Sequence, residues 1–150
     1  FVTIAIFFAI NLQYQGSFAQ FSLKFWGVMD YFYAGTGSPE QGLENTYLKT
    51  KFSTSQYSIG IDYHHFKAAK PVTSTTAKYL ADELDFSASY NLNKFTIVDL
   101  GNSFLKATGA LSFSKNQPPA IPADSFDKSA QWAYLMINVR PEFLSKTNHL

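Results

Sequence analysis

The sequence predicts an all-β fold in which antiparallel strands follow one another up and down. Two stretches carry this prediction, residues 57–64 and 83–90, because polar and apolar residues alternate along both. Side chains in a strand alternate between its two faces, so each stretch has one apolar face and one charged face. The composition agrees, since 17% of the residues are aromatic, mostly Phe and Tyr, and these favour strands. The apolar positions are Tyr57, Ile59, Ile61, Tyr63, Leu84, Phe86, Ala88 and Tyr90.

Length and composition exclude several classes of protein. The 150 residues suffice for one domain of ordinary size or for a piece of a larger one. The net charge is +1 without clustered Lys and Arg, which argues against a nucleic-acid partner. The absence of Cys excludes disulfides and thiolate metal sites. No apolar run reaches the ~18 residues of a membrane helix, but a membrane β-protein would show no such run either.

Residues 1–19 are open to two interpretations. The apolar run at 1–10, followed by the small-x-small residues 17–19, is typical of a signal peptide. The same residues also alternate as an additional strand would. The segment is therefore predicted to be either signal-peptide-like or one more strand.

Residues 20–144 are predicted to consist of strands and loops, followed by a polar tail at 145–150. The connection over 107–130 contains three prolines, which excludes a central strand there. No segment has the apolar stripe of a packed helix. The expected strands cover 21–33, 43–52, 57–66, 83–90, 95–106 and 131–143.

An apolar strand face can point into a soluble barrel or sandwich, or outward to lipid. The connections after residue 33 alternate between longer and shorter ones, and in outer-membrane barrels short turns lie on one side and long loops on the other. This favours an antiparallel up-and-down transmembrane β-barrel. Six or seven strands are fewer than the eight that such barrels need, so we expect a part of a larger barrel. Ion conduction by the purified chain alone would contradict that expectation.

Four blocks of sequence, at 24–33, 42–49, 80–86 and 132–143, resemble in their order the C-terminal part of the alginate-export-type outer-membrane porins of Bacteroidetes. The resemblance implies a barrel in the bacterial outer membrane that passes solutes or anionic polysaccharide. It also implies contact with outer-membrane lipid and with the barrel assembly machinery. Two features depart from the family: Gly101-Asn102 stands where Gly-Tyr is usual, and the chain continues past Phe143.

Charged residues on the inward parity are candidates to line a pore. Rings of such charges select ions, whereas opposite charges on neighbouring strands would pair and neutralise each other, and both outcomes stay open. The candidates are Lys24, Asp30, Lys49, Lys51, Asp62, His64, Glu83, Asp85, Asp99 and Arg140.

No catalytic residue, metal site or cofactor is predicted. The adjacent His64 and His65 should point to opposite faces of one strand and so could not share an ion. Carboxylates in a wet lumen lack the water-excluding pocket that acid–base catalysis needs. The sequence therefore predicts a non-enzymatic, porin-like channel for passive diffusion or export. The alternatives are a soluble lipocalin-like barrel that binds a small hydrophobic ligand, or a non-conducting outer-membrane scaffold.

Overall fold

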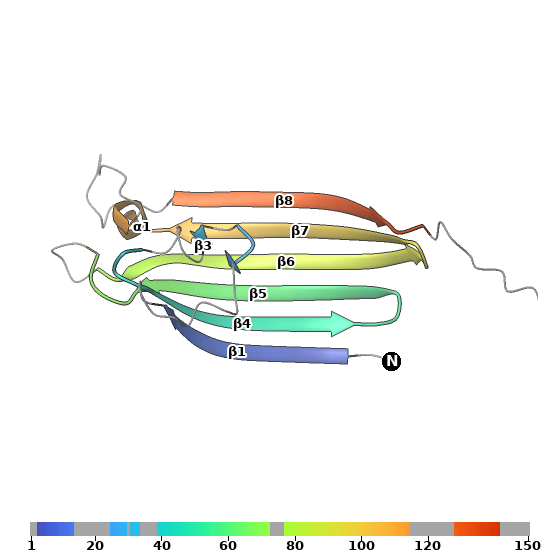
Figure 1. Cartoon of the computed structure of the whole chain (residues 1–150), viewed down its shortest axis with the longest axis horizontal. Coiled ribbons are helices and arrows are strands. Elements are labelled where there is room, and N and C mark those ends of the chain that lie inside the picture. The colour runs from blue at the N-terminus through green and yellow to red at the C-terminus, as the bar shows by residue number, and fades with distance from the viewer. Residues whose placement is uncertain are drawn as a thin grey trace, which may run out of the picture.

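The computed structural model describes residues 3–13, 25–29, 31–33, 39–72, 77–114 and 128–141. Its main feature is one six-stranded antiparallel sheet in the order β1-β4-β5-β6-β7-β8 (Figure 1). This confirms the predicted all-β, antiparallel chain, but the sheet is not closed into a barrel, and β1 and β8 form its two edges. The strands are β1 (Thr3–Gln13), β4 (Leu43–Ser53), β5 (Tyr57–Ala68), β6 (Tyr79–Asn93), β7 (Thr96–Ala107) and β8 (Lys128–Val139).

The register extends the alternation of single strands into two continuous faces. Tyr57 pairs with Tyr90, and Ile61 pairs with Phe86. Directly paired residues lie on the same face, so apolar positions of all six strands line up on one side. We call this side the apolar face; its members include Ile4, Ile6, Leu48, Ile59, Ile61, Phe86, Leu100, Leu135 and Ile137. The opposite side, the polar face, includes Lys49, Lys51, Asp62, His64, Glu83, Asp85 and Asp99.

The division between the faces is weakest on the edge strand β8. Its polar-face positions include Trp132, Tyr134 and Met136. Tyr134 pairs with Gly101, where any added Cβ would overlap the tyrosine ring. The ring therefore covers a position that has no side chain of its own, as aromatic residues do beside strand glycines.

Long and short connections lie at opposite ends of the sheet. The short ones join β4 to β5 and β6 to β7, as the sequence predicts. The long ones leave from the ends of β5 and β7, and we call this the long-connection end (Figure 1). The connection after β7 contains the short helix α1 (Gly109–Ser114), which the sequence did not indicate. No helix within the described residues is long and apolar enough to cross a membrane.

The predicted strand over residues 21–33 is wrong. Of its described residues, β2 (Phe25–Trp26) and β3 (Phe32–Tyr33) pair with each other in a separate two-stranded sheet, the β2–β3 hairpin. Gly27 directly after β2 has a φ of 79°, a left-handed conformation that glycine adopts without steric cost. The chain therefore turns where a straight strand was expected.

The hydrophobic core lies at the long-connection end, on the polar face. Phe32 of the hairpin is fully buried, and its ring centroid lies 4.3 Å from that of Phe66 on β5. The core thus joins the hairpin and helix α1 to the sheet. Its members are Phe32, Leu43, Phe66, Ala68, Leu80, Ala81, Leu105, Ala107, Ala110 and Leu111.

A β-bulge at the start of β6 enlarges this core. Phe66 pairs with Ala81 but Lys67 pairs with Tyr79, so Leu80 is an extra residue in the strand. Leu80 and Ala81 are both buried although they are consecutive. Thr108 holds the bulge, because its hydroxyl donates to the carbonyl of Tyr79 (2.7 Å) and its N–H to that of Leu80 (2.9 Å).

Candidate functional site

The β2–β3 hairpin lies over two carboxylates of the polar face. The N–H of Met29 donates to Glu83 Oε1 (2.7 Å), and that of Val28 donates to Asp85 Oδ2 (3.3 Å). Glu83 is 1% exposed and Asp85 is 3% exposed. These two hydrogen bonds attach the turn of the hairpin to β6. Two of the predicted pore-lining residues therefore face the backbone of the hairpin.

Gly27 makes this close approach possible. A Cβ at this position would lie 2.6 Å from Glu83 Cδ, well inside van der Waals contact. Glu83 cannot move aside freely, because it is buried and bonded to Met29. Both the backbone conformation and the available space thus require glycine. Alternation in the sequence carries no signal for this contact, since Gly27 and Glu83 are far apart along the chain.

His64 lies beside the carboxylates as a packed side chain. It pairs with Glu83 across β5 and β6 and is buried. Its ring stacks between those of Tyr47 (5.5 Å) and Phe66 (5.6 Å), and Nδ1 lies 3.1 Å from Nδ2 of Asn45. The structure places this predicted pore-lining residue between the core and the open part of the polar face.

A cluster of buried polar atoms lies under and beside the hairpin. Within the described part of the chain, His64 Nε2, Glu83 Oε2, Asp85 Oδ1 and Ser103 Oγ are buried and have no hydrogen-bond partner. The register brings them together, since His64 pairs with Glu83 and Asp85 pairs with Ser103. No group of three or more His, Cys, Asp or Glu among the described residues could hold a metal ion. Burying polar groups without hydrogen-bond partners costs free energy. The hydrogen bonds from the amides of Val28 and Met29 offset part of that cost, so docking of the hairpin depends on them.

The remaining charges divide into paired and exposed ones. Lys49 Nζ lies 2.8 Å from Asp62 Oδ2, so this pair neutralises itself, one of the two outcomes the sequence left open. Asp99 accepts hydrogen bonds from Ser89 (2.5 Å) and Asn138 (2.6 Å). Lys51 is exposed on the half of the polar face away from the hairpin, and Arg140 is exposed directly after the end of β8. Lys24 and Asp30 lie outside the described residues.

The structure places His64 and His65 on opposite faces, as predicted. On the apolar side, His65 Nδ1 lies 2.5 Å from Asp82 Oδ1. The hydroxyls of Tyr63 and Tyr79 also donate to Asp82, at 3.0 and 2.7 Å. Sequence reasoning missed this Asp82 cluster, because Tyr79 and Asp82 are three residues apart and share a face only through the bulge.

No protein-family model, no curated protein and no solved structure matches this chain.

Proposed function

We propose that this sheet is part of an outer-membrane β-barrel that acts as a porin-like channel for solutes or anionic polysaccharide. The apolar face would contact lipid, and the polar face would line the aqueous lumen. The observation that carries the proposal is the separation of the two faces. Large apolar side chains remain exposed on all six strands, among them Ile4 (70%), Ile61 (43%) and Leu135 (66%), while Glu83 and Asp85 on the other face are covered.

An uncovered apolar sheet of this extent suits a bilayer better than water. Contiguous exposed apolar patches beyond a few hundred Å² are rare on soluble monomers. On β6 the apolar positions run from Leu84 to Leu92, about 27 Å along a strand that rises ~3.4 Å per residue. A strand tilt of about 40° reduces this to roughly 20 Å, near the ~25 Å apolar band of membrane barrels. The soluble lipocalin-like alternative would need Ile59, Ile61 and Phe86 to line an enclosed cavity, and their exposure of 40–49% supports lipid contact instead.

The β2–β3 hairpin would narrow the lumen of the proposed channel. It is attached to the polar face at the long-connection end, which would be the outer mouth of the barrel. There it covers Glu83 and Asp85, while Lys51 stays exposed further along the polar face. A lumen with this distribution of charge would favour anionic solutes. Outer-membrane lipid and the barrel assembly machinery are the partners that this function requires; it needs no cofactor and no chemical step.

Site-directed spin labelling tests the assignment of the faces. The chain has no Cys, so single cysteines at positions 57–64 can be labelled without background. In reconstituted bilayers, labels at Ile59 and Ile61 should collide with oxygen, which concentrates in lipid. Labels at the matched neighbours Ser58 and Asp62 should collide with a water-soluble nickel chelate. The assignment is refuted if both reagents reach the labels without a two-residue period, or if the chain stays in buffer. Single-channel conductance would then separate a porin from a non-conducting scaffold.

A further inference from the structure

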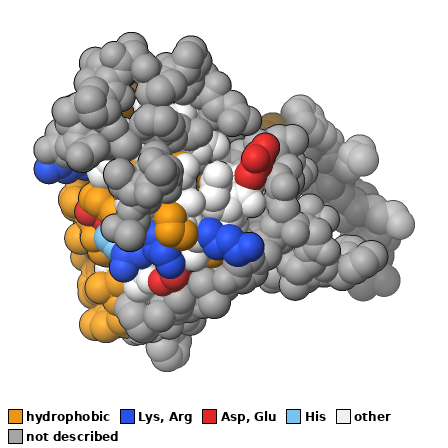
Figure 2. Space-filling view, turned by 90° about the vertical axis from the view of Figure 1, so that its left-hand side faces the viewer, with side chains coloured by type: hydrophobic (Ala, Val, Ile, Leu, Met, Phe, Trp, Pro, Cys, Tyr) orange, Lys and Arg blue, Asp and Glu red, His pale blue; other side chains and the backbone are white. Residues whose placement is uncertain are grey.

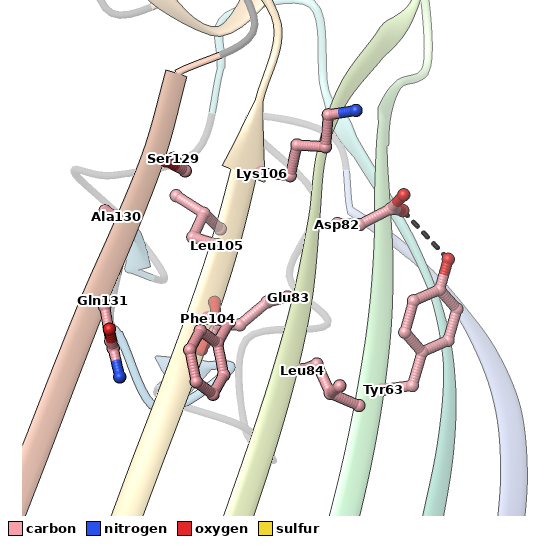
Figure 3. A pocket seen from close by; sticks show the side chains of 10 residues that line it. All are labelled: Tyr63, Asp82, Glu83, Leu84, Phe104, Leu105, Lys106, Ser129, Ala130 and Gln131. Carbon is pink, nitrogen blue, oxygen red and sulfur yellow. Dashed lines mark hydrogen bonds between the residues drawn. The ribbon is translucent and has the colours of Figure 1, made fainter.

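Two carboxyl groups lie buried next to each other beneath the β2–β3 hairpin. Glu83 and Asp85 are two residues apart on β6, so both belong to the polar face, with about 7 Å between their Cα atoms. Figure 3 shows Glu83 between Asp82 and Leu84, the two neighbours in sequence that belong to the apolar side. One oxygen of each carboxyl accepts an amide N–H of the hairpin. The other oxygen of each is buried and has no partner in the described part of the chain.

The strands on either side of β6 bring no lysine or arginine to the polar face, although β5 and β7 are described over their full lengths. On β5, Asp62 pairs with Asp85, and this third carboxylate already binds Lys49 Nζ of β4 (2.8 Å). On β7, Asp85 pairs with Ser103, which carries no charge. Basic groups at the long-connection end lie at the molecular surface, next to apolar side chains (Figure 2). The buried pair therefore lacks a neutralising cation among the strands that pack beside it.

A further titratable neighbour is His64, the register partner of Glu83 on β5. Its ring is buried and stacks between two aromatic rings, and Nε2 has no partner within the described residues. Such an environment disfavours the charged imidazolium, so His64 does not balance the charge of the pair. In the hairpin, the described residues include Tyr31 and Tyr33 but no Lys, Arg, His, Asp or Glu. The hairpin therefore docks on the pair with its backbone and brings no charge of its own.

Burial without a cation decides which protonation state of the pair suits docking. A buried charge without a counter-ion is costly, and a like charge beside it increases the cost. A proton on one carboxyl removes one of the two charges and gives that group an O–H donor. The same carboxyl can still accept the hairpin amide through its other oxygen. The hairpin therefore docks better on a pair that holds a proton than on a fully ionised one.

We propose that the β2–β3 hairpin is a pH-sensitive strap, docked while the Glu83–Asp85 pair holds a proton and released when both carboxyls ionise. Because the docked state binds this proton more tightly than the released state does, docking is strongest in acid and weakens as the pH rises. The role of the strap at a channel mouth rests on the proposed function: release would widen the mouth and expose two negative charges there. The control of docking by the proton does not depend on that function.

The distance between two spin labels tests the strap. The chain has no Cys, so one label is placed on the hairpin by Tyr31→Cys and the other by Ser55→Cys, in the turn between β4 and β5. Double electron–electron resonance on the full chain in micelles, from acid to mildly alkaline pH, gives the populations of docked and released hairpin. We expect the docked distance to dominate in acid. The ratio of docked to released hairpin should fall by up to about tenfold per pH unit, the limit for one linked proton.

Neutral variants locate the proton. Glu83→Gln combined with Asp85→Asn keeps an acceptor for each hairpin amide but cannot ionise, so the hairpin should stay docked at every pH. Asp99→Asn, further along the polar face, and His64→Gln should keep the pH dependence of the unmodified chain. Loss of that dependence in His64→Gln would assign the proton to the imidazole and overturn the proposal. Release of the hairpin in the double variant would overturn it as well, because carboxylate charge would then hold the hairpin.

The strap and the proposed function can fail separately. Docking that is the same at every pH in the unmodified chain would overturn the strap and leave the proposed channel intact. Docking that follows pH, in a chain whose apolar face does not reach lipid in bilayers, would overturn the proposed function and with it the role of the strap at a channel mouth.

Discussion

Replacing Gly27 by Ala should release the β2–β3 hairpin from the sheet. An L-residue in a left-handed conformation costs roughly 1–2 kcal/mol, and Gly27 has a φ of 79°. The new methyl group would also meet the Glu83 carboxyl, which must move and lose its bond to the Met29 N–H. A hydrogen bond of this kind contributes about 0.5–1.5 kcal/mol. Together these effects destabilise docking by about 1.5–3.5 kcal/mol, or some one to two and a half decades in the docking equilibrium at ~1.4 kcal/mol per decade.

Amide hydrogen exchange measures this equilibrium directly. The amides of Val28 and Met29 donate to the carboxyl groups of Asp85 and Glu83 in the docked hairpin, so they should exchange at least about tenfold faster in Gly27→Ala, as local opening becomes easier. Amides in the centre of β5 and β6 should be unaffected.

A double-mutant cycle with Glu83→Ala isolates the contact. In the Glu83→Ala background there is no carboxyl to displace, so Gly27→Ala should cost only the backbone contribution of about 1–2 kcal/mol. Unchanged exchange of Val28 and Met29 in Gly27→Ala would refute the docking geometry. Full additivity of the two substitutions would refute the contact between Gly27 and Glu83.

Three further substitutions follow from the same structure. Phe66→Ala removes the ring that packs on Phe32 and should lower the free energy of unfolding by about 3–5 kcal/mol, measured by denaturant titration in micelles. Lys49→Met breaks the exposed ion pair with Asp62 and should change stability by less than ~1 kcal/mol, with any effect vanishing in high salt. Ile61→Arg places a charge on the apolar face and should weaken insertion by about 2–4 kcal/mol if this position lies near the bilayer midplane; equal recovery of this variant and Ile61→Val in membrane fractions would contradict that.

Alternation along the sequence was sufficient for the sheet, because each strand was read from local residues. The sequence assigns every second residue from Tyr57 to Tyr63 and from Leu84 to Tyr90 to the apolar face. The register places these residues together on that face. Alternation was insufficient at 21–33, because the apolar residues Trp26 and Val28 stand at the even-numbered positions that a half-buried strand would give to polar residues. The structure explains the irregularity, since Gly27 turns the chain between the two short strands of a hairpin.

The candidate site was predicted only in part. Inward-parity charges such as Asp62 and Asp99 could be named, but their partners depend on which strands are neighbours. That Glu83 and Asp85 bind the backbone of Val28 and Met29 could not be predicted, because main-chain donors leave no mark in the sequence. Alternation also does not predict whether a sheet closes into a barrel, because it describes the two sides of a strand and not the curvature of a sheet.

The extra residue in β6 restricts how this protein can change during evolution. Leu80 shifts the parity of the strand by one, so Tyr79 reaches Asp82 on one side while Leu80 itself enters the core on the other. Deleting Leu80 would restore regular alternation, so Tyr79 would stay opposite Lys67 on the face of Asp82, and the core would lose the leucine side chain. The loss of this one codon would therefore remove a fully buried side chain from the core and leave the contacts of Asp82 in place.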